Sequence, residues 1–154
     1  MFIVGTGIDL VDIKRIHRSL EKFGDQFLNR HFTKSEQEFA FTREHDVSTS
    51  KGWTMTSAAL AKMFAAKEAS VKAISLSTGI NWIDIEVKRE KSGKPYIVLH
   101  NQAEANLNMV IDLEAEKLGI TLKKGYIRKV INLSLTDEPP LAGAFVVISV
   151  VHIN

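Results

Sequence analysis

The sequence contains no cysteine in its 154 residues. Disulfide bonds and thiolate chemistry are therefore excluded, which favours a cytoplasmic location. No apolar run approaches the roughly 20 residues that a membrane-spanning helix needs, so no contact with a membrane is expected. The N-terminus lacks the charged leader and small-residue cleavage site of a signal peptide, which predicts that Met1 begins the mature fold.

Several common functional motifs are also missing. The five histidines are scattered without the spacing of a zinc site. Gly5-Thr6-Gly7 lacks the third glycine of a dinucleotide-binding loop, and no serine has the surroundings of a hydrolase nucleophile. The net charge of +2 does not by itself indicate nucleic acid. With 45% hydrophobic and 25% charged residues, the composition predicts one globular domain over residues 1–154.

Hydrophobic periodicity predicts a mixture of helices and antiparallel strands. A first helix is expected to begin at Asp12 and to bury one apolar face, formed by Ile13, Ile16, Leu20 and Phe23. The remaining expected elements are a loop at 42–56, a helix around residue 67, a hairpin of strands at 83–87 and 96–99, a helix at 102–118, and a hairpin of strands at 130–136 and 142–151.

The helix around residue 67 carries a charge inside its apolar stripe. Leu60, Phe64 and Val71 recur at helical spacing, and Lys67 lies between them. Glu68 follows at the border of the stripe. A buried ammonium is costly without a partner, so the adjacent lysine and glutamate indicate either a structural ion pair or a functional site.

The N-terminal strand presents a carboxylate on a face with little side-chain bulk. Strict alternation places Gly5, Gly7 and Asp9 on one face, which leaves room for another backbone or a ligand. The alternation places Phe2, Val4, Ile8 and Leu10 on the opposite face. Asp9 and Glu68 together offer two oxygen ligands, and Lys67 a cation. This set suits one Mg²⁺ that holds a phosphate-bearing substrate.

Four segments in this order resemble the holo-acyl-carrier-protein synthases, a group of 4′-phosphopantetheinyl transferases. They are GIDLVDIKRI at 7–16, RHFTKSE at 30–36, FAAKEA at 64–69, and DIEV at 84–87 followed by SGKP at 92–95. A Ser-Leu-Thr segment at 134–136 also fits. The resemblance implies an α+β fold, an antiparallel sheet packed with helices, and a homotrimer with active sites between adjacent subunits.

The resemblance further implies transfer of 4′-phosphopantetheine from coenzyme A to a serine of an acyl carrier protein, in support of fatty acid biosynthesis. Asp9 and Glu68 would hold Mg²⁺, and Glu68 or a metal-bound water that it orients would take the serine proton. Lys67 would neutralise or protonate the departing phosphate. The residues expected to hold coenzyme A are Lys67, Gly93, Lys94, Pro95, Ser134 and Thr136.

A basic stripe on the first helix is the expected docking face for the acidic carrier protein, formed by Lys14, Arg15, Arg18 and Lys22. Such a stripe is more often only a solvated surface. Two other functions stay open: a carrier-binding module without chemistry, and a small basic nucleic-acid binder. The second leaves Asp9, Lys67 and Glu68 unexplained.

The chain departs from the family's pattern at two positions. Asp137 stands where the family has a histidine near the 3′-phosphate of the nucleotide, and Met63 stands where an arginine is common. Asp137 is expected either to cap the following turn at 138–140 or to face the ligand, and the turn is the favoured expectation. The segments at 42–56 and 117–128 look longer than the family's spacing.

Overall fold

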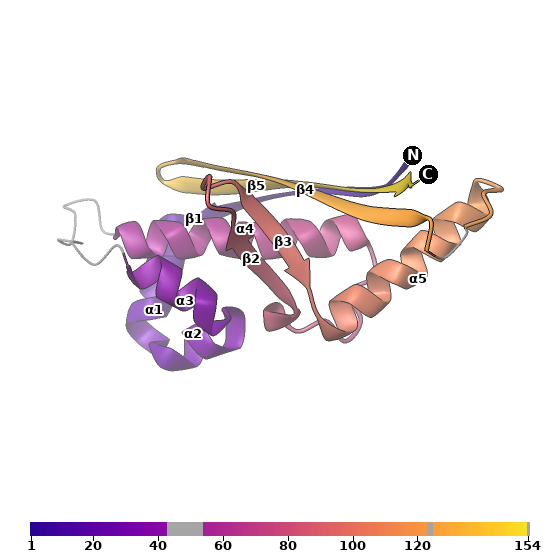
Figure 1. The fold of residues 1–154 in the computed structure, drawn as a ribbon. Coiled ribbons are helices and arrows are strands. Elements are labelled where there is room, and N and C mark those ends of the chain that lie inside the picture. The colour runs from indigo at the N-terminus through magenta and orange to yellow at the C-terminus, as the bar shows by residue number, and fades with distance from the viewer. Residues whose placement is uncertain (43–53, 123–124, 154) are drawn as a thin grey trace.

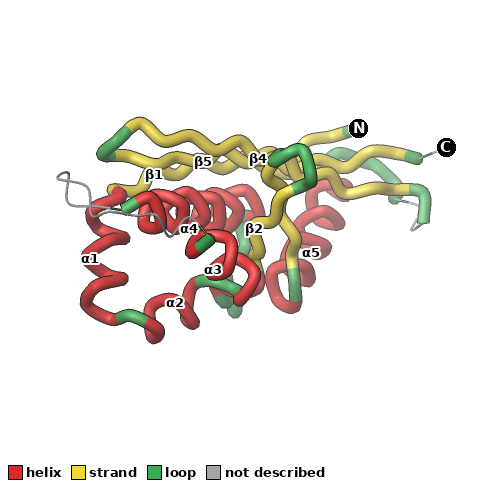
Figure 2. Tube along the Cα trace, turned by 60° about the vertical axis from the view of Figure 1, so that its left-hand side comes forward, coloured by secondary structure: helices red, strands yellow, loops and turns green. Residues whose placement is uncertain are grey.

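The computed structural model describes residues 1–42, 54–122 and 125–153. A three-stranded antiparallel sheet in the order β1-β5-β4 forms one layer, from β1 (Phe2–Asp12), β5 (Leu141–His152) and β4 (Ile127–Glu138). The helices lie on one side of this sheet, and no described element covers its other face (Figures 1 and 2). The expected α+β class with antiparallel strands is confirmed.

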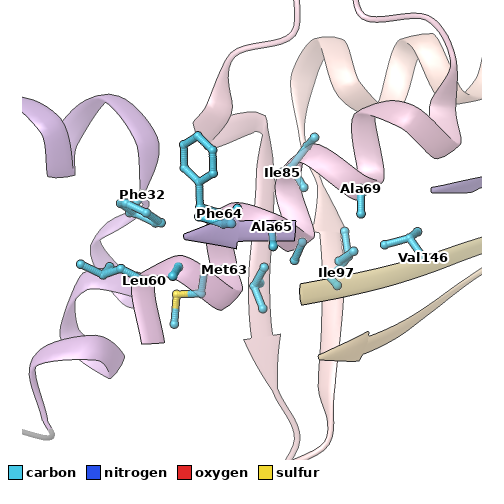
Figure 3. Close-up of a cluster of buried hydrophobic side chains, with 14 of the residues drawn as sticks. Phe32, Leu60, Met63, Phe64, Ala65, Ala69, Ile85, Ile97 and Val146 are labelled. Atoms are coloured by element: carbon cyan, nitrogen blue, oxygen red, sulfur yellow. The ribbon is translucent and has the colours of Figure 1, made fainter. Parts of the chain in front are cut away.

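Helix α4 (Met55–Ile74) is the centre of the molecule. It packs along the inner face of β1 and β5, and it also contacts α1 (Ile13–Phe23), α3 (Lys34–Phe41), β2 (Ile85–Arg89) and α5 (Asn101–Lys117). Because α4 is covered on nearly all sides, most of its residues are buried. Figure 3 shows its residues Leu60, Phe64 and Ala69 within this core.

Two glycines allow β1 to lie directly on the backbone of α4. A Cβ atom on Gly7 would lie 1.9 Å from the carbonyl oxygen of Ala69, and one on Gly5 would lie 2.1 Å from that of Ala73. Real Cβ atoms do not approach an oxygen so closely, so only glycine fits. The room predicted beside Asp9 is therefore taken by the backbone of α4.

The predicted alternation of β1 is broken near its start. The pairing register with β5 shifts between Ile3 and Gly5, as in a β-bulge. Phe2 consequently packs against the core, whereas Ile8 and Leu10 are exposed on the outer face. Val4 packs against the core with Phe2, so the prediction that these two residues share a face with Ile8 and Leu10 was wrong for this reason.

The first helix forms as predicted, with one difference at its end. The Asp12 side chain accepts a hydrogen bond from the backbone N–H of Lys14 at 2.8 Å and so caps α1. Ile13 and Ile16 are buried, but Phe23 is half-exposed. A short helix, α2 (Asp25–His31), follows and precedes α3.

The remaining elements agree with expectation within a few residues. The first hairpin joins β2 to β3 (Pro95–Leu99), but its start is a turn of 3₁₀ helix, η1 (Trp82–Asp84), which holds Ile83. In the last hairpin the strands are longer than predicted, so that only Pro139 and Pro140 lie between them. Of the expected loop at 42–56, residues 43–53 lie outside the described part, and α4 has already begun at Met55.

No helix in the described ranges is both long and apolar enough to cross a membrane.

Candidate active site

Asp9 and Lys72 join β1 to α4 at an open edge of the sheet. Asp9 occupies the inner face of β1, because Gly5 and Gly7 bring this strand onto the helix. The Lys72 ammonium donates to Asp9 Oδ1 at 2.8 Å and to the carbonyl oxygen of Ile8 at 3.0 Å. The Lys72 side chain is 52% exposed and Asp9 16%, so the pair lies at the surface.

Glu68 completes a cluster of three charges. Partial burial and the negative charge of Asp9 raise the pKa of the Glu68 carboxyl, and the positive charges of Lys72 and Arg15 partly oppose this rise. The structure therefore brings Asp9 and Glu68 into one electrostatic environment, as the sequence predicted.

The donor set of this cluster fits a magnesium ion. Mg²⁺ is bound by one or two carboxylates and takes its other ligands from substrate phosphates and water. Asp9 and Glu68 supply two carboxylates whose mutual repulsion a divalent cation would relieve. In the described residues no group of three or more His, Cys, Asp or Glu side chains forms a fuller metal cage.

Lys67 does not join this cluster. Its side chain is fully buried, and its ammonium donates to Glu36 Oε2 at 2.9 Å and to the carbonyl oxygens of Trp82 and Ile85. Burial lowers the pKa of Lys67, and Glu36 partly offsets this effect. The structural ion pair that was one of the two readings of Lys67 exists, but its partner is Glu36 and not Glu68.

Lys72 is the residue that sequence reasoning missed. It follows Glu68 by one helical turn, so both side chains project toward the same end of β1. That spacing was visible in the sequence as Lys-Glu-x-x-x-Lys over 67–72. The spacing placed Lys67 in the buried stripe, but it does not reveal that Glu36 of α3 is the partner of Lys67 and that Lys72 is the lysine that contacts Asp9.

The basic stripe of α1 is exposed and begins next to the cluster. Lys14, Arg15, Arg18 and Lys22 are all exposed, as a docking face requires. Arg15 is close enough to Glu68 to influence its pKa. Arg15 also lines a cavity of about 330 Å³ beneath α1, whose other walls include Phe23, Phe27, Arg30 and Phe64.

Ser134 and Thr136 lie on the outer face of the sheet. Together with Asp9, Gly143 and Phe145 they line a shallow depression of about 120 Å³. The structure therefore places the hydroxyls of Ser134 and Thr136 at the same depression as Asp9. The carboxylate of Asp9, however, accepts its hydrogen bond from Lys72.

Gly93, Lys94 and Pro95 form the tip of the β2–β3 hairpin, where Gly93 has a φ of +87°. The tip reaches toward the three-stranded sheet (Figures 1 and 2). These three residues do not line the depression over Gly143. Within one chain, the residues predicted to bind the nucleotide therefore lie in two separate places. Ser134 and Thr136 lie at the depression on the outer sheet face, and Gly93, Lys94 and Pro95 lie at the tip of the β2–β3 hairpin.

Asp137 neither caps a turn nor lies in one. It belongs to β4, where it pairs with Ala142, and its carboxylate accepts a hydrogen bond from the Lys62 ammonium at 2.8 Å. The favoured expectation of a turn cap was wrong, because the hairpin is tighter than predicted and its turn begins only at Pro139.

Comparison with known proteins identifies the family of this chain. Residues 5–121 match the profile of the 4′-phosphopantetheinyl transferase superfamily. A holo-[acyl-carrier-protein] synthase of Xanthobacter autotrophicus is 41% identical over 97% of this chain and 96% of its own length. One of Bartonella quintana is 38% identical over 95% of both chains. A crystal structure of a holo-(acyl-carrier-protein) synthase from Bacillus anthracis in complex with CoA (3′,5′-ADP) superimposes with a TM-score of 0.64 at 25% identity, covering 96% of this chain and 97% of the other.

The fold and these relatives place the chain among the phosphopantetheinyl transferases, a class of enzyme. Within that class the chain belongs to the holo-acyl-carrier-protein synthase family.

Proposed function

We propose that this chain transfers 4′-phosphopantetheine from coenzyme A to a serine hydroxyl of an apo acyl carrier protein. A bond forms between the serine oxygen and the β-phosphorus of coenzyme A, and the bond from that phosphorus to adenosine 3′,5′-bisphosphate breaks. The observation that carries the proposal is the cluster of Asp9, Glu68 and Lys72 beside an exposed basic helix.

We assign separate roles in the transfer to the two carboxylates and to the Lys72 ammonium. Asp9 and Glu68 would hold Mg²⁺, which supplies positive charge for the pyrophosphate when bound. Glu68 would also take the serine proton, directly or through a water molecule that it orients. Phosphoryl transfer depends mainly on positioning and electrostatic stabilisation, which this cluster provides.

Lys72 is the cation that we assign to the departing phosphate. Its exposed ammonium contacts Asp9 and lies one helical turn from Glu68, whereas Lys67 is enclosed by Glu36 and two carbonyl oxygens. The hydrogen bond to Asp9 raises the pKa of Lys72, which keeps the ammonium charged, and this positive charge would stabilise the leaving phosphate oxygen as negative charge develops on it.

The carrier protein is proposed to dock on α1. Lys14, Arg15, Arg18 and Lys22 present four cations to solvent, and an acidic partner is steered by such a surface. Because Arg15 also acts on Glu68, docking at this helix would bring the attacking serine close to the proposed base.

We also propose a homotrimer with active sites between subunits. The outer sheet face exposes Ile3, Ile8, Leu10 and Phe145, and an apolar sheet face of this kind is typical of an interface. The depression lined by Asp9, Ser134 and Thr136 opens on the same face, so a neighbouring subunit could complete the nucleotide site with its own hairpin at Gly93–Pro95. Sedimentation of a monomer at micromolar concentration would contradict this assembly.

One experiment tests the function. The protein is incubated with coenzyme A, Mg²⁺ and an apo acyl carrier protein, and the carrier is weighed by mass spectrometry. A mass gain equal to phosphopantetheine supports the transferase. A carrier that binds but gains no mass supports the binding module instead. A cytoplasmic role in fatty acid biosynthesis, performed by residues 1–154 as one domain, is part of the same proposal.

A further inference from the structure

The Lys67 ammonium is enclosed by oxygen atoms from three elements. It donates to Glu36 Oε2 of α3 at 2.9 Å, to the carbonyl oxygen of Trp82 in η1 at 3.0 Å, and to the carbonyl oxygen of Ile85 at the start of β2. Both side chains of the Lys67–Glu36 pair have no exposed surface. Every proton of the ammonium therefore has a fixed acceptor.

The Glu36 carboxylate is held with equal completeness. Its Oε1 accepts from the backbone N–H of Val87 at 2.8 Å, and its Oε2 accepts from the backbone N–H of Thr33 at 2.8 Å as well as from Lys67. The hydrogen bonds of this ion pair thus connect α4 to the N-terminus of α3 and to β2.

This arrangement fixes the rotation of α4 about its own axis. Successive residues on a helix are about 100° apart, so the direction of Lys67 determines that of Glu68, the next residue, and of Lys72. On another side of the same helix, Gly5 and Gly7 of β1 lie against its backbone at Ala73 and Ala69. The helix is held between the ion pair and the strand that carries Asp9.

Replacing a buried ion pair by apolar side chains often leaves stability unchanged or increases it. A fully enclosed pair is therefore poorly explained by stability alone. Directional bonds differ from apolar contacts in allowing only one rotation and one register of the helix, and the residue adjacent to Lys67 is the proposed metal ligand Glu68.

We infer that the Lys67–Glu36 ion pair is a positioning device that aims Glu68, and with it Lys72, at Asp9. Lys67 acts through the helix and has no contact with the reacting atoms. This inference rests on the proposed function only for the identity of the metal ligands.

The test compares the neutral double variant Lys67→Met/Glu36→Gln with the wild type. Removing both charges avoids leaving one buried charge unpaired, so the variant is expected to fold, which circular dichroism and thermal unfolding verify. The matched control is Lys129→Met/Glu104→Gln, which removes a surface ion pair of 2.8 Å between β4 and α5.

The main measurement is Mn²⁺ affinity of the full-length protein, read by electron paramagnetic resonance without substrate. We expect the dissociation constant to rise about tenfold in the positioning variant and to stay unchanged in the control. In the transfer assay kcat should fall at least tenfold while the KM for the carrier protein stays within twofold. The single variants Lys67→Arg and Glu36→Asp, which keep the charges, should retain more Mn²⁺ affinity than the double variant.

A folded double variant with wild-type Mn²⁺ affinity and kcat would overturn the inference and leave the pair with a structural role. A wild type that binds no Mn²⁺ would overturn it as well. A wild type that binds Mn²⁺ but transfers nothing would refute the proposed function, while the comparison of Mn²⁺ affinities would still decide the positioning role.

Discussion

The ammonium of Lys72 lies 2.8 Å from a carboxylate oxygen of Asp9, and this contact joins the first strand to the central helix. Glu68, one helical turn before Lys72, shares the same electrostatic environment. Three charged side chains from β1 and α4 are thereby gathered at one edge of the sheet. Their separate removal is expected to affect catalysis in different ways.

The two carboxylates should be indispensable for transfer. Asp9→Asn and Glu68→Gln keep the size of each side chain but remove its charge, so each variant should fold and lose at least about 100-fold in kcat/KM, which corresponds to ~2.7 kcal/mol. The measurement is phosphopantetheine transfer followed by mass spectrometry, with EDTA-treated wild type restored by Mg²⁺ for comparison. Glu114→Gln on α5 serves as the control. Near-normal turnover in either variant would refute the metal assignment.

Loss of Lys72 should change both the rate and its pH dependence. In Lys72→Met the cation that lowers the pKa of Glu68 is gone, so the pKa of Glu68 should rise further. Because the base must be deprotonated, the acidic limb of the pH–kcat profile should move to higher pH, and kcat itself should fall. An unchanged profile with normal kcat would show that Lys72 has no role in the chemistry.

Charge reversal on α1 should act on the carrier protein alone. Arg18→Glu should raise the KM for the carrier protein several-fold and flatten its dependence on salt, since fewer cations then attract the acidic partner. The KM for coenzyme A should not change. Lys117→Glu on α5 is the control. Equal weakening of both substrates would mean that the stripe has another function, such as maintaining the fold.

The stability of the protein should fall in acid because of Glu86. Burial alone would raise the pKa of Glu86, but hydrogen bonds from Ser35, His100 and Thr33 outweigh it and lower the pKa to about 2. A carboxyl with a lowered folded-state pKa stabilises the fold above its unfolded pKa of 4.5 and loses this contribution as the pH falls toward 2.

Each unit of difference between the folded and unfolded pKa corresponds to about 1.36 kcal/mol, so Glu86 contributes about 3 kcal/mol at most to the free energy of unfolding. Urea unfolding at pH 6 and at pH 3 measures the difference. In Glu86→Gln the fall in stability between these two pH values should be smaller by about 2 kcal/mol, because at pH 3 the contribution of Glu86 is only partly lost. A fall of the same size in both proteins would assign the acid sensitivity to other carboxylates.

The Lys62–Asp137 pair should influence recognition of the nucleotide. Family resemblance implies that position 137 lies near the 3′-phosphate of coenzyme A, and in this chain Asp137 neutralises Lys62 there. Asp137→Asn removes the negative charge and frees the cation, so it should lower the KM for coenzyme A about tenfold, or ~1.4 kcal/mol. The KM for dephospho-coenzyme A should not change. Equal effects on the two substrates would place Asp137 away from the 3′-phosphate, and an unchanged KM for both would place it outside the nucleotide site.

Local patterns were sufficient for most of the fold. Asp12 was expected to cap α1 and does so, and the turn at 92–95 was expected to join two strands and does so. These features depend on neighbours in sequence, so propensity and spacing reveal them. The bulge in β1 was missed because it depends on the register of pairing with β5, a strand that is distant in sequence. The turn between β4 and β5 was expected but placed too wide, because strand pairing continues as far as Glu138 and Leu141.

In the candidate site, too, some features could be predicted from local sequence and others depend on distant segments. Asp9 and Glu68 were recognised from the sequence, because two carboxylates beside a lysine and two glycines form a recognisable motif. The burial of Lys67 was expected from its place in the apolar stripe, but its enclosure away from Glu68 was not available there. It depends on Glu36 and on the carbonyl oxygens of Trp82 and Ile85, which only the packing of α3, η1 and β2 brings to Lys67.

The sequence by itself thus determined most of the elements and the class of chemistry, and it pointed to two candidate carboxylates, since these follow from residue types at short spacings. Only the tertiary structure decided which groups enclose Lys67 and that Lys72 is the lysine that contacts Asp9. The reason is physical: the cost of burying an ammonium depends on the acceptors around it, and those acceptors are contributed by segments far apart in the chain.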